Sequence, residues 1–377
     1  MKIFVKRQNV LNTLSHATRL IDRKSTVPVL SNVKISTTDD GFIEISSTDL
    51  QIGLIEKLPA QVEQTGSITV SAQMAFEIVR RLPDDAIISF EEKTTDDSSH
   101  VEIRSGASIF RLGTLPVEGY PTISTDPLDF SFSVDPKEFS ASLQRCHFAM
   151  AQEETRYYLN GVYLHPVEGE NGKIFLNLVA TDGHRLAKVR VPGLELEKKF
   201  EGVILPRKAV IEIIKILETA PKSLLISLSS TSCMMKVGDM CVLTTRLIEG
   251  TFPNYGKVIP INNPQKVDIK IQDLAQSVER VSLVSTDKFG AVKMTFQENK
   301  IILTANSLEY GSAKDELDVN LQGVDLEVGF NARYLLEVLH HIEGEYVTVY
   351  LRDAGSAALF KSPQDHSSDF VIMPMRA

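Results

Sequence analysis

The chain has 377 residues, of which 43% are hydrophobic and 24% charged, the balance of a folded protein with room for two or three domains. No apolar run reaches the ~18 residues that a membrane-spanning helix needs, and the first residues lack the apolar stretch of a secretory signal. The net charge of −9 speaks against general affinity for nucleic acid, because phosphate binding depends on lysine and arginine. The three cysteines lack the spacing of a disulfide framework or zinc site, so we expect buried thiols in a reducing cytoplasm: Cys146, Cys233 and Cys241.

A pattern of alternating residues that runs into apolar residues at helical spacing begins the chain and occurs three times. The copies are residues 3–14 (IFVKRQNVLNTL), 132–143 (FSVDPKEFSASL) and 269–278 (IKIQDLAQSV). Alternation predicts a strand and a period near 3.6 predicts a helix. Each copy therefore predicts a strand followed by a helix.

A second pattern also occurs three times, at residues 70–82 (VSAQMAFEIVRRL), 205–217 (LPRKAVIEIIKIL) and 330–342 (FNARYLLEVLHHI). Aligned without gaps, the copies place a glutamate at the eighth position: Glu77, Glu212 and Glu337. Each copy follows a strand-like run and precedes another alternating run. The shared register indicates one plan written three times.

The sequence thus predicts an α+β protein of three repeated domains, each with two strand–helix units. Alternating runs between the units predict mostly antiparallel sheet with one buried face, which the helices would cover. Polar, proline-containing segments at Ser124–Asp129 and Pro260–Gln265 predict linkers. We expect domains at 1–125, 126–260 and 261–377. Gene duplication without functional symmetry would leave the same pattern.

The six predicted helices carry more positive charge than the rest of the chain. Their windows sum to +5 by residue count, which leaves −14 for the remainder. If the helices share a face, that face could hold a polyanion without reading its sequence. Ordinary solvated helix faces explain the count equally well.

One segment resembles a chemical site, ATDGHRLA at residues 180–187. Asp182 and His184 could act as base and orienter, or as two metal ligands, in a hydrolase. The alternative is a tight connection between two strands, since DG favours a turn. No nucleophile or third ligand is evident, and the phosphate-loop, dinucleotide and hydrolase motifs are missing. We therefore predict no catalytic residue, metal or cofactor.

The last residues, DFVIMPMRA, are apolar and contain Met373 and Met375. They suit a final core strand, and the methionines also suit an adaptable groove for partner peptides. The two interpretations are compatible, because Pro374 would end the strand pairing. If they form such a groove, removing residues 371–377 should abolish peptide binding without unfolding the protein.

Six segments in this order resemble the bacterial DNA polymerase III β subunit, the replicative sliding clamp: RYYLNG (156–161), ATDGHRLA, PRKAVIE (206–212), FPNY (252–255), GFNARY (329–334) and VIMPMR (371–376). The likeness covers essentially the whole chain. It implies the DNA clamp fold, a ring-shaped homodimer with helices inside and antiparallel sheets outside. Such a ring encircles duplex DNA after a clamp loader places it there, and tethers polymerase and other replication or repair proteins without a cofactor.

The resemblance also implies site residues. The peptide-binding pocket would comprise Leu159, Thr181, Gly183, His184, Arg185, Leu186, Pro253, Val258, Phe289, Asn331, Tyr334, Val371, Ile372, Met373, Pro374 and Met375. DNA-facing positions would be Lys24, Arg80, Tyr157, Tyr158, Arg207 and Lys208. The ring interface would join Phe110 and Leu112 of one subunit to Leu283 and Val284 of another.

The sequence departs from the family pattern at several positions. Glu153 stands where the family has a DNA-contacting glutamine, and Gln73–Met74 stand where it has a basic pair. Lys257 replaces a pocket arginine, and Gly355 replaces a larger apolar residue. A peptide-binding scaffold that never encloses DNA is a further alternative to the clamp.

Overall fold

A computed structural model describes residues 1–21, 26–95, 98–122, 127–285, 290–321 and 325–375. Two predicted site residues, Lys24 and Phe289, lie outside this part of the chain. Among the described residues, no helix is long and apolar enough to cross a membrane. The chain forms two compact units, residues 1–137 with 208–247 and residues 138–207 with 248–377. They are called unit 1 and unit 2 below.

Every α-helix of the described residues begins within two residues of the end of a strand, as the sequence predicts. The strand–helix pairs are β1 (Lys2–Lys6) with α1 (Arg7–Leu20), β6 (Ser67–Ser71) with α2 (Ala72–Arg81), β10 (Phe130–Val134) with α3 (Pro136–His147), β14 (Val203–Pro206) with α4 (Arg207–Leu217), β18 (Gln265–Lys270) with α5 (Ile271–Ser282), and β22 (Leu326–Asn331) with α6 (Ala332–His341). The side chain of Ser71 caps α2 by accepting from the amide of Met74 at 3.4 Å. The same role falls to Asn331 at the start of α6.

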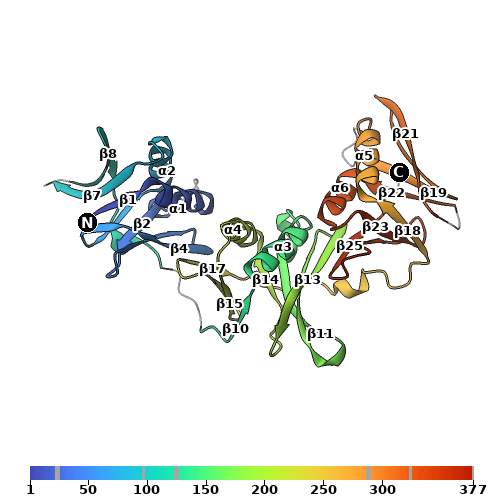
Figure 1. Ribbon diagram of the computed structural model, residues 1–377, viewed down its shortest axis with the longest axis horizontal. Coiled ribbons are helices and arrows are strands. Elements are labelled where there is room, and N and C mark those ends of the chain that lie inside the picture. Colours follow the sequence, from blue (N-terminus) through green and yellow to red (C-terminus); the bar gives the residue numbers. More distant parts are fainter. Residues whose placement is uncertain (22–25, 96–97, 123–126, 286–289, 322–324, 376–377) are drawn as a thin grey trace. The chain divides into compact units, whose positions relative to one another are not determined.

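Unit 1 contains two antiparallel sheets (Figure 1). The five-stranded sheet has the order β5-β1-β7-β8-β9, and the eight-stranded sheet has the order β10-β15-β16-β17-β4-β3-β2-β6. Strands not yet given bounds are β2 (Asn32–Thr37), β3 (Phe42–Thr48), β4 (Ile52–Pro59), β5 (Gln61–Gln64), β7 (Ile87–Thr95), β8 (Ser98–Ser105), β9 (Ser108–Gly113), β15 (Leu224–Leu228), β16 (Ser232–Val237) and β17 (Cys241–Arg246).

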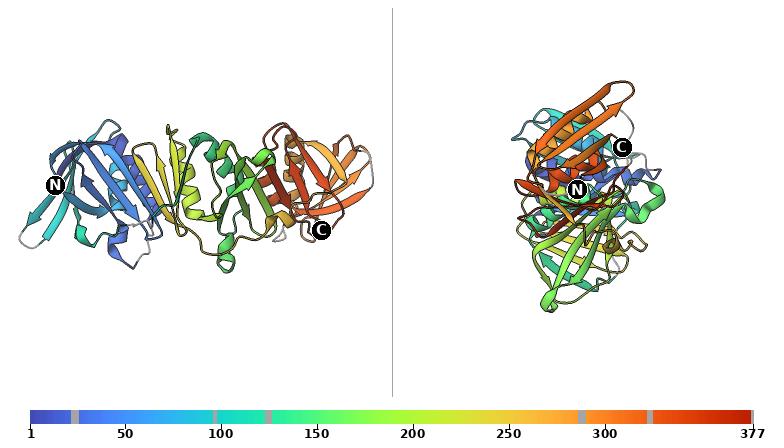
Figure 2. Two further views of the ribbon diagram at one scale, coloured as in Figure 1. Left: turned by 90° about the horizontal axis from the view of Figure 1, so that it is seen from below. Right: turned by 90° about the vertical axis from the view of Figure 1, so that its right-hand side faces the viewer.

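The core of unit 1 lies between its helices and both sheets. Val10 and Leu14 of α1 are fully buried, and so are Ile3 of β1, Phe90 of β7 and Val70 of β6. Seen from below, the strands lie in front of α1 (Figure 2). Alternation along strands such as Ile43–Ile45 places one face of the sheet in this core, which confirms the predicted half-buried sheet.

Unit 2 repeats this arrangement. Its eight-stranded sheet has the order β14-β11-β12-β13-β25-β24-β23-β18, and its four-stranded sheet has the order β21-β20-β19-β22. The remaining bounds are β11 (Gly161–Glu168), β12 (Ile174–Thr181), β13 (Arg185–Leu196), β19 (Ala291–Gln297), β20 (Lys300–Ser307), β21 (Gly311–Asp318), β23 (Tyr346–Leu351), β24 (Ala358–Lys361) and β25 (Ser368–Ile372). Helix α5 packs on α6 and on β20 and β21.

The central third of the chain contributes to both units. Strands β10, β15, β16 and β17 complete the large sheet of unit 1, whereas β11 to β14 belong to unit 2. Each eight-stranded sheet combines strands from two neighbouring thirds of the chain. The two compact units therefore coincide with the sheets and do not end at the predicted linkers. The domain boundaries near residues 125 and 260 therefore stay a prediction.

Candidate functional site

The segment 180–187 forms a tight turn between β12 and β13 of unit 2. The hydroxyl of Thr181 donates to the carbonyl of Arg185 at 2.7 Å. One carboxylate oxygen of Asp182 accepts from the amides of His184 and Arg185, at 2.9 and 3.0 Å. Gly183 has a φ of +89°, and a Cβ there would lie 2.6 Å from the Arg156 guanidinium. The Asp182 carboxylate is therefore a turn-forming group, as the strand-connection interpretation predicts.

Arg185 fixes this turn against helix α6. Its side chain is 6% exposed, and its guanidinium pairs with Asp182 at 3.1 Å and with Glu337. A second amino group donates to the carbonyl of Phe148 at 2.9 Å. The guanidinium carbon lies 4.4 Å from the centre of the Tyr334 ring. Burial lowers the pKa of Arg185, and the neighbouring Asp182 acts against this shift.

His184, in contrast, is exposed and lies beside Tyr334, with ring centres 6.4 Å apart at an angle of 23°. Asn331 caps α6 and accepts from the amide of Tyr334 at 3.2 Å, which places the tyrosine at the start of the helix. The turn and the helix N-terminus thus present His184 and Tyr334 together.

Beneath the turn lies an apolar cluster. Leu186 of β13 is paired in register with Val371 of β25, and both are buried. Leu159, at the end of a 3₁₀ helix (Glu154–Leu159), packs into the same cluster. The further buried members are Ala151, Val179, Ile204, Phe252 and Leu359. Burial of this area stabilises the site and provides an apolar floor.

The segment after β25 forms one edge of the site. Val371 and Ile372 are fully buried, and β25 pairs with both β13 and β24. Met373 is 39% exposed and its amide donates to the carbonyl of His184 at 2.8 Å. Strand β25 ends before Pro374, and the amide of Met375 donates to the carbonyl of Gly329. Because β25 lies within the sheet, removing residues 371–377 would disrupt the fold, which argues against our expectation from the sequence.

An aromatic cluster positions the segment Phe252–Ile259. The Phe252 ring stacks on Tyr163, with ring centres 4.8 Å apart at 4°. The Tyr255 hydroxyl lies 2.7 Å from Nε2 of His165, whose pKa is lowered by burial. Tyr163 and His165 were not predicted, although their alternation on β11 was a usable signal. The cluster leaves Pro253 and Val258 exposed.

Two cavities flank the contact between Met373 and His184. One, of about 510 Å³, is formed by Gly256–Asn263, Arg352, Ser356, Ala357 and Met373. The other, of about 190 Å³, is formed by Met150–Glu153, Arg156, Asp182, His184, Arg185, Arg333 and Tyr334. Lys257 belongs to the first cavity, and Gly355 lies beside it in a turn around Asp353. An apolar floor with a few polar groups and adjoining cavities is typical of a site for a short peptide.

Several predicted DNA-facing residues make contacts within their own unit. Arg80 is 52% exposed and pairs with Glu77 at 2.8 Å. Lys208 binds the Asp49 carboxylate and the Leu20 carbonyl. In unit 2, Arg207 donates to the Met150 carbonyl at 3.4 Å. Tyr157 is 55% exposed, whereas Tyr158 packs against the apolar cluster; Glu153 pairs with Arg156 at 2.7 Å.

The predicted interface residues lie near the ends of two sheets. Phe110 and Leu112 are on β9, the last strand of the five-stranded sheet, and pack against the core of unit 1. Leu283 and Val284 follow α5, which packs on β21, the last strand of the four-stranded sheet. Leu283 is 80% exposed.

Comparison with known proteins matches the entire length of the chain. The N-terminal, central and C-terminal domains of the DNA polymerase III beta subunit match residues 1–124, 133–254 and 256–376. The beta sliding clamp of Caulobacter vibrioides is 36% identical over 376 residues, and that of Escherichia coli K12 is 33% identical over 378 residues; both alignments cover 100% of each chain. The chain belongs to the DNA polymerase III beta subunit family, the bacterial sliding clamps.

Solved clamp structures agree. The Caulobacter crescentus beta sliding clamp superposes with a TM-score of 0.95 at 36% identity and covers 100% of this chain and 99% of its own. A DnaN sliding clamp from Bartonella birtlesii, bound to griselimycin, gives a TM-score of 0.92 at 36% identity with full coverage of both chains. The predicted clamp fold is confirmed, and the chain acts as the non-catalytic sliding clamp subunit of DNA polymerase III in DNA replication. The hydrolase alternative is thereby wrong.

Proposed function

We propose that two copies of the chain close into a ring that encircles duplex DNA after a clamp loader opens it, and that the ring works in the cytoplasm. The domain boundaries predicted near residues 125 and 260 would divide each subunit into three similar parts. The helices carry a net charge of +5, against −9 for the whole chain, which suits a helix-lined hole around a polyanion. Such a ring holds DNA by enclosure. Glu153 and Gln73–Met74 would therefore weaken the contact between protein and DNA without releasing the DNA from the ring.

The ring interface would join the two end strands, β9 of one subunit and β21 of the other. End strands carry unpaired backbone groups that favour pairing with another chain. Phe110, Leu112, Leu283 and Val284 would supply apolar contact beside that pairing. A head-to-tail contact of this kind closes into a ring when the rotation permits it.

Retention on circular DNA tests the enclosure. The protein is loaded on a nicked circular plasmid with a clamp loader and separated by gel filtration. We expect stable retention on the circle and loss after the plasmid is linearised by a restriction enzyme. Equal retention on both forms would contradict enclosure and favour a scaffold that merely binds DNA.

The peptide site would be the surface formed by the 180–187 turn, the Phe252–Ile259 segment and the residues around Met373. The observation that carries this assignment is the apolar floor of Leu159, Leu186 and Val371 beside two cavities. Partners would be polymerase subunits and other replication or repair proteins that insert an extended segment with apolar side chains. Griselimycin, which the Bartonella relative binds, is expected to compete for this surface.

Fluorescence anisotropy with a peptide carrying the polymerase's clamp-binding segment tests the site. Met373→Ala should weaken binding by about tenfold, because it removes apolar contact of roughly 1–2 kcal/mol. Met240→Ala is the matched control, since Met240 is 38% exposed, like Met373 at 39%, and lies in unit 1. Equal affinity of both variants for the peptide would contradict the assignment.

A further inference from the structure

The turn that builds the site in unit 2 has a counterpart in unit 1, between β3 and β4. There, the hydroxyl of Thr48 donates to the carbonyl of Ile52 at 3.0 Å and accepts from the amide of Leu50 at 2.9 Å. One carboxylate oxygen of Asp49 accepts from the amides of Gln51 and Ile52, at 2.9 and 2.8 Å. Thr181 and Asp182 make the same four bonds in unit 2.

The backbone of the two turns also agrees. Leu50 has a φ of +76° at the position where Gly183 has a φ of +89°. A leucine rarely adopts this left-handed conformation, because its Cβ crowds the backbone. The turn is thus formed in unit 1 despite an unfavourable residue. This segment, Thr48–Ile52, is called the first-junction turn below.

The two eight-stranded sheets match strand for strand. Read from β6, the sheet of unit 1 has the order β6-β2-β3-β4-β17-β16-β15-β10, and that of unit 2, read from β14, has the order β14-β11-β12-β13-β25-β24-β23-β18. In unit 2 the pair Leu186–Val371 crosses from β13 to β25. The corresponding pair in unit 1 is Gly53–Thr244, from β4 to β17.

A similar segment covers both sheets. Tyr120-Pro121 follows β9 as Phe252-Pro253 follows β17. Tyr120 is 8% exposed, and its hydroxyl donates to the carbonyl of Ser46 at 2.9 Å. The covering segment thus closes the unit 1 sheet near the first-junction turn, as the aromatic cluster does in unit 2.

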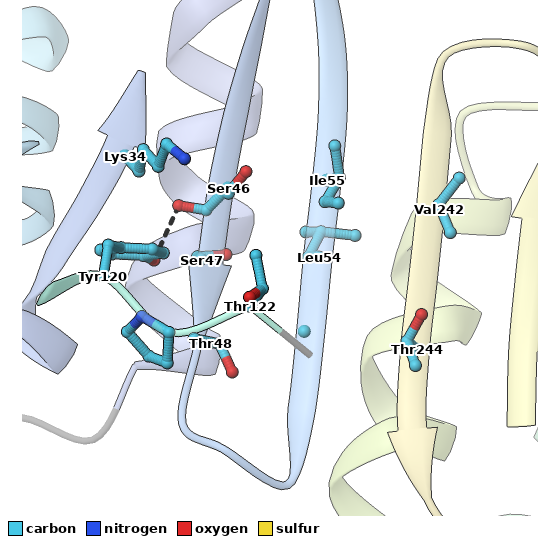
Figure 3. A pocket seen from close by; sticks show the side chains of 12 residues that line it. Lys34, Ser46, Ser47, Thr48, Leu54, Ile55, Tyr120, Thr122, Val242 and Thr244 are labelled. Carbon is cyan, nitrogen blue, oxygen red and sulfur yellow. Dashed lines mark hydrogen bonds between the residues drawn. The ribbon is translucent and has the colours of Figure 1, made fainter. Parts of the chain in front are cut away.

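A cavity of about 90 Å³ lies at this place in unit 1 (Figure 3). Its described lining consists of Lys34, Ser46, Ser47, Thr48, Gly53, Leu54, Ile55, Tyr120, Pro121, Thr122, Val242 and Thr244. Where unit 2 has Leu186 and Val371, this cavity has Gly53 and Thr244. Lys34 on β2 lies opposite Ser46 on β3, and Tyr163 on β11 lies opposite Val179 on β12. Because these strands correspond, Lys34 occupies in unit 1 the position that Tyr163 has in unit 2. The cavity therefore keeps apolar walls, such as Leu54, Ile55 and Val242, and adds hydroxyls and one ammonium group where unit 2 has an apolar floor.

We propose that this cavity is a second docking site of the clamp, which takes the aspartate or glutamate side chain of an extended partner peptide. Lys34 is the cationic side chain of the described lining, and a carboxylate complements its charge. The hydroxyl of Ser46, which lies opposite Lys34 on the neighbouring strand, suits the same carboxylate as a donor. The cavity volume of about 90 Å³ admits a short side chain such as aspartate. The inference rests on the proposed function only in supposing that partners dock on this repeated framework.

Binding of capped tripeptides to the full chain, followed by NMR chemical shifts, tests the proposal. Acetyl-Ala-Asp-Ala-amide should bind at least tenfold more tightly than its Asn analogue. Lys34→Met should weaken the Asp peptide about tenfold. Lys57→Met should leave its affinity unchanged, because Lys57 lies on β4 of the same sheet, outside the cavity, and contacts Glu44.

Equal affinity for the Asp and Asn peptides, or an unchanged affinity in Lys34→Met, would overturn the proposal. Tighter binding of acetyl-Ala-Ala-Ala with a free C-terminal carboxylate would also overturn the proposal. It would show that the cavity binds the C-terminus of a peptide and not an acidic side chain. Griselimycin binding and retention on circular DNA are measured on the same variants. If griselimycin binding and retention on circular DNA persist while the Asp peptide fails to bind, only the second site is wrong. If the unmodified chain shows neither griselimycin binding nor retention, the proposed function is wrong.

Discussion

The guanidinium of Arg185 lies 4.4 Å above the ring of Tyr334, and it joins the turn before β13 to helix α6. The same guanidinium pairs with Asp182 and Glu337 while only 6% of the side chain is exposed. Removing one partner of a buried ion pair leaves an uncompensated charge. Arg185 therefore positions the peptide site and also stabilises unit 2.

Arg185→Met should reduce the stability of unit 2 by about 3–5 kcal/mol, because Asp182 and Glu337 lose their buried partner. Urea unfolding followed by circular dichroism measures the loss. Arg333→Met is the control, because Arg333 also pairs with Glu337 but is 71% exposed. Its substitution should lower the free energy of unfolding by less than about 1 kcal/mol. Similar losses in both variants would contradict the structural role of Arg185.

Leu50→Gly should raise the stability of unit 1 by roughly 0.5–1 kcal/mol, because glycine adopts a φ of +76° without a steric penalty. The neighbouring Gln51→Gly should instead lower stability, since it adds only backbone entropy to the unfolded chain. Thermal unfolding of the two variants compares them. A loss of stability in Leu50→Gly would show that the leucine side chain, which is 47% exposed, contributes more than the turn costs.

We expect His341 to make the stability of unit 2 sensitive to acid. Burial, together with nearby His147, His340 and Arg185, lowers the pKa of His341 to about 4. Because this pKa is depressed in the folded protein, the neutral His341 ring stabilises the fold above pH ~6.5. This stabilisation is lost as the pH falls toward 4 and the ring is protonated. Because the His341 ring is only partly buried, solvent screening keeps this loss of unfolding free energy below about 3 kcal/mol.

The variant His341→Phe should flatten stability between pH 6.5 and 4, since phenylalanine keeps the stacking on Phe148, where the ring centres are 4.5 Å apart. Unfolding midpoints at several pH values measure the difference between the variant and the unmodified protein. Parallel curves for the two proteins would rule out His341 as the source.

The three cysteines should resist alkylation in the folded protein. Cys146 and Cys233 are fully buried and Cys241 is 8% exposed, and burial raises the pKa of each thiol. The reactive thiolate is therefore scarce. Reaction with a disulfide reagent should be at least tenfold slower in buffer than in denaturant, where three thiols should react. One fast thiol in buffer would contradict this burial.

Leu283→Asp should shift the dimer toward monomer, because a charge would be buried in the proposed interface. Sedimentation at micromolar concentration measures the shift. Leu308→Asp is the control, as Leu308 is also strongly exposed but was not assigned to the interface. If the Leu283→Asp variant stays as dimeric as the unmodified protein, the interface lies elsewhere.

Periodicity predicted the strand–helix order well, since each helix of the described residues begins within two residues of a strand end. The register of Glu77, Glu212 and Glu337 was also informative: each forms an ion pair, with Arg80, Arg19 and Arg333 respectively. These patterns are local, and local patterns are readable along the chain.

The repeated turn was not found from the sequence. Only Thr and Asp are shared between STDLQI and ATDGHR, and Leu50 conceals the left-handed position that Gly183 reveals. The joining of β4 to β17 and of β13 to β25 was equally hidden, because strands far apart in the chain leave no periodic signal of their pairing. These two junctions decide where the cavities lie.

The pairing of β4 with β17 has a consequence during synthesis. Strand β4 ends at Pro59 and β17 begins at Cys241, so about 180 residues separate them. At the usual rates of translation, β4 waits roughly 10–40 s on the ribosome with one row of backbone amides and carbonyls open. Until β17 emerges, the first third of the clamp therefore has an uncovered sheet edge that can pair with another chain.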